Sequence, residues 1–185
     1  RPGTMEKLGL GYEVLKEINP RLIYASSTGY GQTGPYSQRP AYDAVVQAMG
    51  GIMSITGQAD GMPTRVGTSI GDIAAGLFCA IGILAALQER ARSGLGQMVD
   101  VAMLDCQVAI LENAISRYEF TGEIPRPIGN RHPSIVPFET FNTLSDPIMV
   151  AAGNDRLWAT LCELMELEIA CDSRYATNPQ RNEHY

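Results

Sequence analysis

The segment GTSIGDIAAG, residues 67–76, decides how this 185-residue sequence is interpreted. In this segment one carboxylate, Asp72, stands directly before a run of 15 apolar residues, 73–87. The run predicts a long helix over about 72–92, with Gly94 as its left-handed cap. Because the run is shorter than the ~20 residues that span a bilayer, we expect a buried core helix and no membrane span.

The residue types leave two interpretations of Asp72. In the first, Asp72 is the N-cap, and its side chain satisfies free backbone N–H groups at the helix start. In the second, the carboxylate stays ionised beside oriented N–H donors and attacks acyl groups, while the donors receive an oxyanion. Glycines at 67, 71 and 76 would let a bulky ligand approach the backbone. Residue types alone favour the cap, and the spacing does not decide.

Working outward from this segment, hydrophobic periodicity and turn residues predict the other elements. Before it we expect a helix over 9–18, a strand over 21–26, a glycine- and serine-rich loop over 26–35, a helix over 41–49 and a glycine-rich bridge over 50–71. After it we expect a strand over 98–103, a helix over 104–119, a proline-rich connection over 122–137, an antiparallel pair over 138–141 and 148–152, and a helix over 154–167 capped by Asn154 or Asp155. This order predicts an α/β body, 1–121, followed by the beginning of a smaller α+β domain, 122–185.

Composition and charge narrow the function classes. The chain is 45% hydrophobic and 18% charged, which is typical of a globular protein, and its net charge of -6 argues against a nucleic-acid partner. The four cysteines lie far apart without a CxxC motif or a nearby histidine pair, so we expect no metal site and reduced thiols. The expected compartment is therefore a reducing one, the cytoplasm or the mitochondrial matrix. The sequence starts without Met or a signal peptide, and we expect a fragment of a longer protein.

Several motifs, in register along almost the whole chain, resemble those of CoA-transferase family III. They are the RPG…LGLGY run of 1–12, the YASSTGYGQTGP loop of 24–35, the R-x-x-Y-D-x-x-x-Q-A segment of 39–48, the Gly71-Asp72 helix start, MVDVAMLDCQVAIL at 98–111, GNRHPSIVP at 129–137 and the GND motif at 153–155. The resemblance implies an enzyme that moves CoA between a thioester and a free carboxylic acid, with coenzyme A as part of the substrate and no metal.

The resemblance also implies roles for individual residues. Asp72 would attack the acyl-CoA carbonyl, form a mixed anhydride and then an aspartyl-CoA thioester. Tyr42 would lie beside the reacting thioester, although an aromatic with a satisfied hydroxyl is the plainer interpretation. The positions that resemble CoA-binding ones are Arg1, Lys7, Arg39 and Met103. Solvated surface cations and a strand-core methionine are the plainer interpretations of these four residues.

The same resemblance implies a fold and an assembly. Family members carry an N-terminal Rossmann-like half and form interlocked homodimers, and their partners are acyl-CoA and carboxylic acid substrates. Two alternatives stay open: an α-methylacyl-CoA racemase-like enzyme, or a non-catalytic fragment. The racemases place a histidine where this chain has Tyr42, which favours the transferase. Asp43 either orients groups around the site or caps the helix of 43–49, and His132 is expected to be a structural hydrogen-bonding residue.

Overall fold

The computed structural model describes all residues, 1–185, and they form two units. Unit 1 comprises residues 1–57 and 62–127, and unit 2 comprises 58–61 and 128–185. Each unit has its own two-stranded sheet, parallel in unit 1 and antiparallel in unit 2. The predicted mixed α/β class is therefore confirmed, whereas the domain division at 121/122 stays a prediction.

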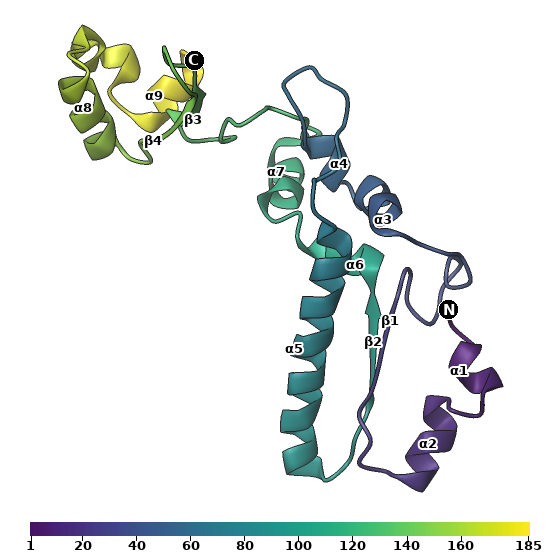
Figure 1. Ribbon diagram of the computed structural model, residues 1–185. Helices are drawn as coiled ribbons and strands as arrows, with labels where there is room; N and C mark the ends of the chain where they lie inside the picture. Colours follow the sequence, from purple (N-terminus) through teal and green to yellow (C-terminus); the bar gives the residue numbers. More distant parts are fainter. The chain divides into compact units, whose positions relative to one another are not determined.

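Unit 1 is built on one long helix beside a pair of parallel strands (Figure 1). Its elements are α1 (Thr4–Lys7), α2 (Tyr12–Ile18), β1 (Tyr24–Thr28), α3 (Asp43–Met49), α4 (Ile52–Ile55), α5 (Ile70–Ser93), β2 (Met98–Ala102), α6 (Met103–Ala109) and α7 (Asn113–Thr121). Strand β1 pairs with β2 from Tyr24 opposite Met98 to Thr28 opposite Ala102. Parallel neighbours need a long crossover, which here includes α5, and α5 packs against both strands.

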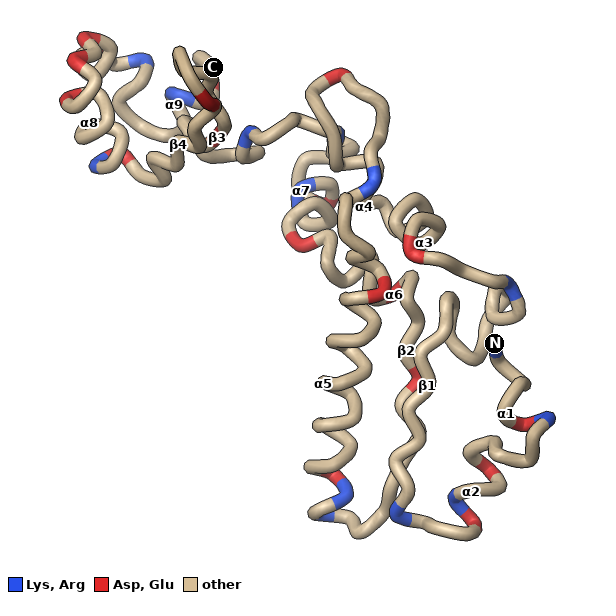
Figure 2. Tube along the Cα trace, viewed as in Figure 1, with Lys and Arg blue, Asp and Glu red and all other residues tan.

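Helix α5 is only partly buried. Small residues face the strands, with Ala74 and Ala75 each 3% exposed, whereas Leu77, Ile81 and Leu84 are 60–65% exposed. Figure 2 shows that no charged residue interrupts most of its length. The expectation of a buried core helix is therefore wrong for this chain, because a sheet of two strands covers only one side of a helix that is apolar all round.

The length argument against a membrane span does not hold, whereas the expectation of no membrane span stays a prediction. Helix α5 has 24 residues and contains an 18-residue window with a mean hydropathy of 2.2, which satisfy the length and composition of a membrane span. The 15-residue apolar run is shorter than the helix, which also includes residues 70–72 before the run and residues 88–93 after it. One such helix is weak grounds for a membrane protein, since the core helix of a water-soluble enzyme meets the same criteria.

Three other sequence expectations need correction in unit 1. The predicted helix of 104–119 is two helices, α6 and α7, because the backbone between them breaks and Glu112 adopts a φ of 54°. The bridge of 50–71 contains the short helix α4. The strand predicted over 21–26 lies at Tyr24–Thr28, because the pairing with β2 includes polar residues that a hydrophobic pattern does not mark.

Unit 2 contains the predicted antiparallel pair. Its elements are β3 (Phe138–Phe141), β4 (Ile148–Ala151), α8 (Asp155–Leu164), the 3₁₀ turns η1 (Glu168–Cys171) and η2 (Ser173–Tyr175), and α9 (Asn178–Glu183). The Asn154 side chain accepts a hydrogen bond from the backbone N–H of Leu157 at 2.9 Å, which confirms one of the two predicted caps. Helix α9 was not predicted, although Thr177 and Gln180 form a capping box at its start.

Candidate active site

Asp72 lies at the third position of α5 and not at its cap. The helix begins at Ile70, and the N-cap residue, Ser69, makes no side-chain cap bond. The Asp72 side chain is exposed and takes part in no hydrogen bond or ion pair of the chain. The interpretation of Asp72 as the N-cap is therefore wrong, because the helix starts two residues earlier than the apolar run indicates.

A different aspartate caps α5. Asp43 Oδ1 accepts a hydrogen bond from the backbone N–H of Gly71 at 2.9 Å, across 28 positions of sequence. Asp43 opens α3 and is only 8% exposed. Its neighbour Tyr42 is the N-cap residue of α3 and is 76% exposed. The structure thus brings Asp43, the neighbour of Tyr42, into contact with Gly71, the neighbour of Asp72, so that the start of α3 lies against the start of α5.

Gly71 permits this approach of the two helices. A Cβ atom at position 71 would lie 2.7 Å from Cγ2 of Val46 and 3.2 Å from Oδ1 of Asp43. Val46 is fully buried, so it has little room to move. Gly76, one and a half turns along α5, has nothing within 4 Å of a notional Cβ. Close packing against α3 therefore explains why position 71 is glycine. At Gly76 there is open space around the position of a Cβ atom, so packing within the chain does not require glycine there.

A polar cluster behind the start of α5 consists of the buried residues Asp43, Gln47 and Gln107 and the exposed Arg65. Gln47 is fully buried, and its Nε2 donates to Asp43 Oδ2 at 2.7 Å. Arg65 Nη1 lies 3.8 Å from the same carboxylate oxygen. Gln107 is also fully buried, and neither polar atom of its amide has a hydrogen-bond partner. The sequence predicted no role for the two glutamines. Gln47 lies one turn after Asp43 on α3, and Gln107 comes from a different helix, α6, so that the cluster appears only once the chain is folded.

The four predicted CoA-binding residues lie in three different settings. Arg1 and Lys7 are exposed and form no ion pair. Arg39 is exposed, and its guanidinium stacks over the Tyr36 ring at 4.2 Å from the centroid. Met103 is the first residue of α6 and packs against the core around Ala74 and Val101, so its interpretation as a strand residue is wrong. Their contact with CoA stays a prediction.

Other candidate groups do not form a second reactive centre. No group of three or more His, Cys, Asp or Glu side chains could hold a metal ion. His132 has the predicted structural role, because its Nδ1 accepts from the backbone N–H groups of Ser134 and Ile135, each at 3.1 Å. Burial raises the pKa of the Cys106 thiol, and this favours the protonated, unreactive form.

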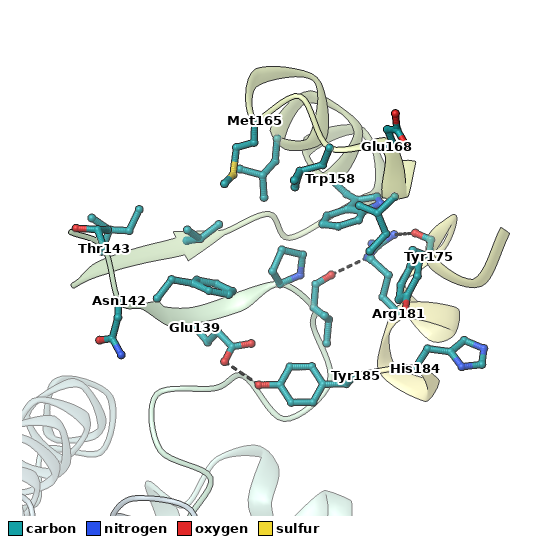
Figure 3. A pocket seen from close by; sticks show the side chains of 18 of the residues that line it. Glu139, Asn142, Thr143, Trp158, Met165, Glu168, Tyr175, Arg181, His184 and Tyr185 are labelled. Carbon is teal, nitrogen blue, oxygen red and sulfur yellow. Dashed lines mark hydrogen bonds between the residues drawn. The ribbon is translucent and has the colours of Figure 1, made fainter. Parts of the chain in front are cut away.

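Unit 2 contains an apolar hollow of about 790 Å³ (Figure 3). Two of its polar side chains are engaged: the Tyr185 hydroxyl donates to Glu139 at 2.8 Å, and Arg181 Nε donates to the Val136 carbonyl at 2.7 Å. Trp158 Nε1, which also lines the hollow, is buried without a hydrogen-bond partner. The hydrogen bond to Glu139 raises the pKa of Tyr185. Because the predicted catalytic residues Asp72 and Tyr42 both belong to unit 1, the start of α5 is the candidate active site.

Comparison with known proteins identifies the class to which this site belongs. The sequence model of CoA-transferase family III matches residues 1–185. The chain belongs to this family, as its motifs indicate.

Relatives within the family are CoA-transferases by name. The chain is 49% identical over 183 residues to an acetyl-CoA:oxalate CoA-transferase of Acetobacter aceti, covering 98% of the chain and 47% of that protein. It is 45% identical to a succinate–glutarate CoA-transferase of Agrobacterium fabrum, covering 97% of the chain and 45% of the relative. The racemase alternative is therefore not favoured. The chain spans about half the length of the curated relatives it matches.

Solved structures agree with this assignment. A CAIB/BAIF family protein from Brucella suis is 44% identical and superposes with a TM-score of 0.82, covering 98% of the chain and 48% of that structure. The Rv3272 protein of M. tuberculosis is 34% identical with a TM-score of 0.85 and covers 100% of the chain and 48% of that structure. The fold of this chain is thus part of the family III fold.

Proposed function

We propose that this chain forms part of an enzyme that transfers CoA from an acyl-CoA thioester to a free carboxylic acid, with Asp72 as the nucleophile. One observation carries the proposal: Asp72 presents an exposed carboxylate without an internal partner at the start of a long helix, while Asp43 does the capping. A carboxylate that is accessible and free of hydrogen bonds is ready to attack a carbonyl carbon.

The proposed reaction consists of exchanges between acyl compounds. A carboxylate oxygen of Asp72 attacks the thioester carbonyl, the C–S bond breaks, and CoA leaves as a thiolate. The thiolate then attacks the side-chain carbonyl of Asp72 in the mixed anhydride, so that the donor acid leaves as a carboxylate and an aspartyl-CoA thioester forms. The acceptor carboxylate attacks this thioester, and the same two steps run in reverse. Each step exchanges bonds of comparable acyl activation, so no ATP is consumed.

The position of Asp72 in the first turn of α5 suits this chemistry electrostatically. The positive end of the helix dipole stabilises the negative charge that develops on the carbonyl oxygen in the tetrahedral intermediate. In the first turn the N–H groups of Ile70, Gly71 and Ile73 are bonded to Thr68 O, Asp43 Oδ1 and Ser69 O. The backbone N–H of Asp72 itself has no such partner and can donate to the oxyanion of a tetrahedral intermediate. The exposed cations Arg1, Lys7 and Arg39 are the candidates for contact with the CoA phosphates.

The names of the relatives suggest the substrate class. They include enzymes for oxalate, for glutarate with succinate, and for mesaconate, all of which are dicarboxylic acids. We infer a dicarboxylic acid as acceptor or donor for this protein as well. We also propose that the full-length protein is a homodimer and that it is located in the cytoplasm or the mitochondrial matrix. Because the chain spans about half the length of its relatives, all of these properties are proposed for a protein of their full length.

The test is covalent trapping on the full-length protein. With acyl-CoA present, hydroxylamine should convert Asp72 to a hydroxamate, and borohydride should reduce its thioester, both detectable by peptide mass spectrometry. Asp72→Ala should abolish the adduct and lower CoA transfer by at least about 10³-fold, the scale on which covalent catalysis depends on its nucleophile. An active preparation without any adduct on Asp72 would refute the proposal.

A matched control distinguishes the nucleophile from acidity in general. Asp105 is an exposed aspartate in the first turn of another unit 1 helix, α6. Asp105→Ala removes the same charge at the same kind of helix position, and we expect it to leave transfer and trapping within a factor of about 3, as is typical of exposed surface substitutions. Equal losses in the two variants would count against a specific role of Asp72.

A further inference from the structure

We propose that Asp43 is a positioning residue that caps α5 in place of Asp72 and thereby keeps the Asp72 carboxylate free for the acyl group. The inference rests on the proposed function, because it assigns a role relative to the Asp72 nucleophile. Its basis is a division of labour between two aspartates at the same helix start: the buried one is fully hydrogen-bonded, and the exposed one is not bonded at all.

The first step concerns the helix start itself. The first N–H groups of any α-helix lack partners within the helix, and a side chain at the cap usually accepts from one of them. Ser69 makes no such bond, and Gly71 N–H donates instead to Asp43 Oδ1 at 2.9 Å. Without Asp43, the nearest carboxylate along the chain would be that of Asp72. A backbone N–H bound to Asp72 would stabilise the charged form of its carboxylate and lower its reactivity.

The second step concerns what holds Asp43 in place. Its Oδ2 accepts from Gln47 Nε2 at 2.7 Å, one turn further along α3. The other end of the Gln47 amide, Oε1, accepts from the backbone N–H of Val66 at 2.8 Å. Arg65 adds a cation 3.8 Å from Asp43 Oδ2.

Together these contacts fix the segment that leads into Asp72. One face of α3 holds the backbone of 65–71 through Val66 at one end and through Gly71 at the other. A buried carboxylate with a defined set of partners permits few alternative arrangements of the segment. The Cα of Asp72, which directly follows Gly71, is thereby held at one position relative to α3 and to Tyr42.

Variants of the full-length protein test the inference through the rate of adduct formation on Asp72. Asp43→Ala should slow single-turnover trapping by about 30-fold, because small misplacements of a reacting group cost up to ~10²-fold. The KM of the Asp43→Ala variant for acyl-CoA should change by less than about threefold, because a positioning residue affects the chemical step and not the binding of the substrate. Asp43→Asn retains an oxygen that can accept from Gly71 N–H and should recover most of the rate.

Two further variants make every result decisive. Val46→Ala, on the same helix, removes buried volume and leaves the cap intact; an equal loss of trapping rate in this variant would overturn the inference. Gln47→Leu keeps the side-chain volume and removes the donor to Asp43, and should show an intermediate rate even where Asp43→Ala does not fold. If Gln47→Leu and Asp43→Asn both trap at the wild-type rate, Asp43 has no positioning role.

The same experiment separates the inference from the proposed function. Wild-type protein without an Asp72 adduct refutes the function and with it the inference. Wild-type protein with an adduct, together with an unchanged rate in Asp43→Ala, refutes only the positioning role.

Discussion

The two units each bury one charged side chain and use it differently. In unit 1, Asp43 is 8% exposed, and its hydrogen bonds lead to the backbone directly before Asp72, whose carboxylate is left free. In unit 2, Arg181 is 2% exposed, and its guanidinium binds three backbone carbonyls and the carboxylate of Asp155. A buried charge therefore indicates a functional site only where its hydrogen bonds position a reactive side chain and leave that side chain itself unbonded. Arg181 meets no such group and has a structural role.

The largest expected effect in this comparison comes from Arg181. Arg181→Met leaves the buried carbonyl of Val136 and the carboxylate of Asp155 without their donor, and should lower the free energy of unfolding of unit 2 by about 3 kcal/mol. Trp158 is the only tryptophan of the chain, and its ring lies 5.3 Å from the Arg181 guanidinium carbon, so its fluorescence in urea reports this unit.

Arg181→Lys is the matched variant, since it keeps the charge but not the fork of donors. It should recover only part of the lost stability. A loss below about 1 kcal/mol in Arg181→Met would show that a well-packed apolar side chain replaces the ion pair, as happens at some buried salt bridges. In that case the contrast with Asp43 would no longer hold.

A smaller effect is expected in unit 1, at the glycine between the two aspartates. Gly71→Ala places a Cβ 2.7 Å from Val46 and should destabilise the protein by about 1–3 kcal/mol, the usual cost of overpacking a core. It should also slow trapping on Asp72, because α3 and the start of α5 must separate. Adding Val46→Ala should restore part of both losses, which a double-mutant cycle in urea and a trapping assay would detect.

Gly76→Ala provides the control of opposite sign. This helix position has open space around a notional Cβ, so alanine should stabilise the helix by up to about 1 kcal/mol through its higher propensity. If both glycine substitutions were neutral, close packing of α3 would not be the reason for glycine at position 71.

These contrasts also show what sequence reasoning could and could not find. The catalytic role of Asp72 stays a prediction, and the residue was singled out as a candidate because a carboxylate before a long apolar run, within an ordered set of motifs, is a local feature of the sequence. The cap that frees it was not, since Asp43 and Gly71 are 28 positions apart and meet only through packing. The same is true of Gln107, whose burial depends on how α6 folds against α5.

The fold was predictable where the periodicity was strong. Helix α5, strand β2 and the pair of β3 and β4 lie within a few residues of their predicted bounds. The break at Glu112 was not predicted, because a non-glycine residue at positive φ leaves no mark in a hydrophobic pattern. Apolar composition also does not predict how much of the surface of a helix is buried. Helix α5 is apolar on all sides, but the two-stranded sheet covers only one side of it.

The smallest effect is expected at an exposed ion pair of unit 2, which makes the contrast with buried Arg181 sharper. The Arg174 guanidinium, with its side chain and backbone N–H donating to Asp172, lowers the pKa of that carboxyl from 3.8 to about 2. A folded-state pKa below the unfolded one stabilises the fold above about pH 4, and the contribution is lost as pH falls toward 2.

Asp172→Asn should therefore lower the urea midpoint of Trp158 fluorescence slightly at neutral pH and not at all near pH 2. Because the Arg174 side chain is 61% exposed and that of Asp172 is 32% exposed, added salt should shrink the neutral-pH difference further, whereas the loss in Arg181→Met should persist. A difference between Asp172→Asn and wild type that survives both low pH and high salt would mean that Asp172 acts through packing or its turn and not through its charge.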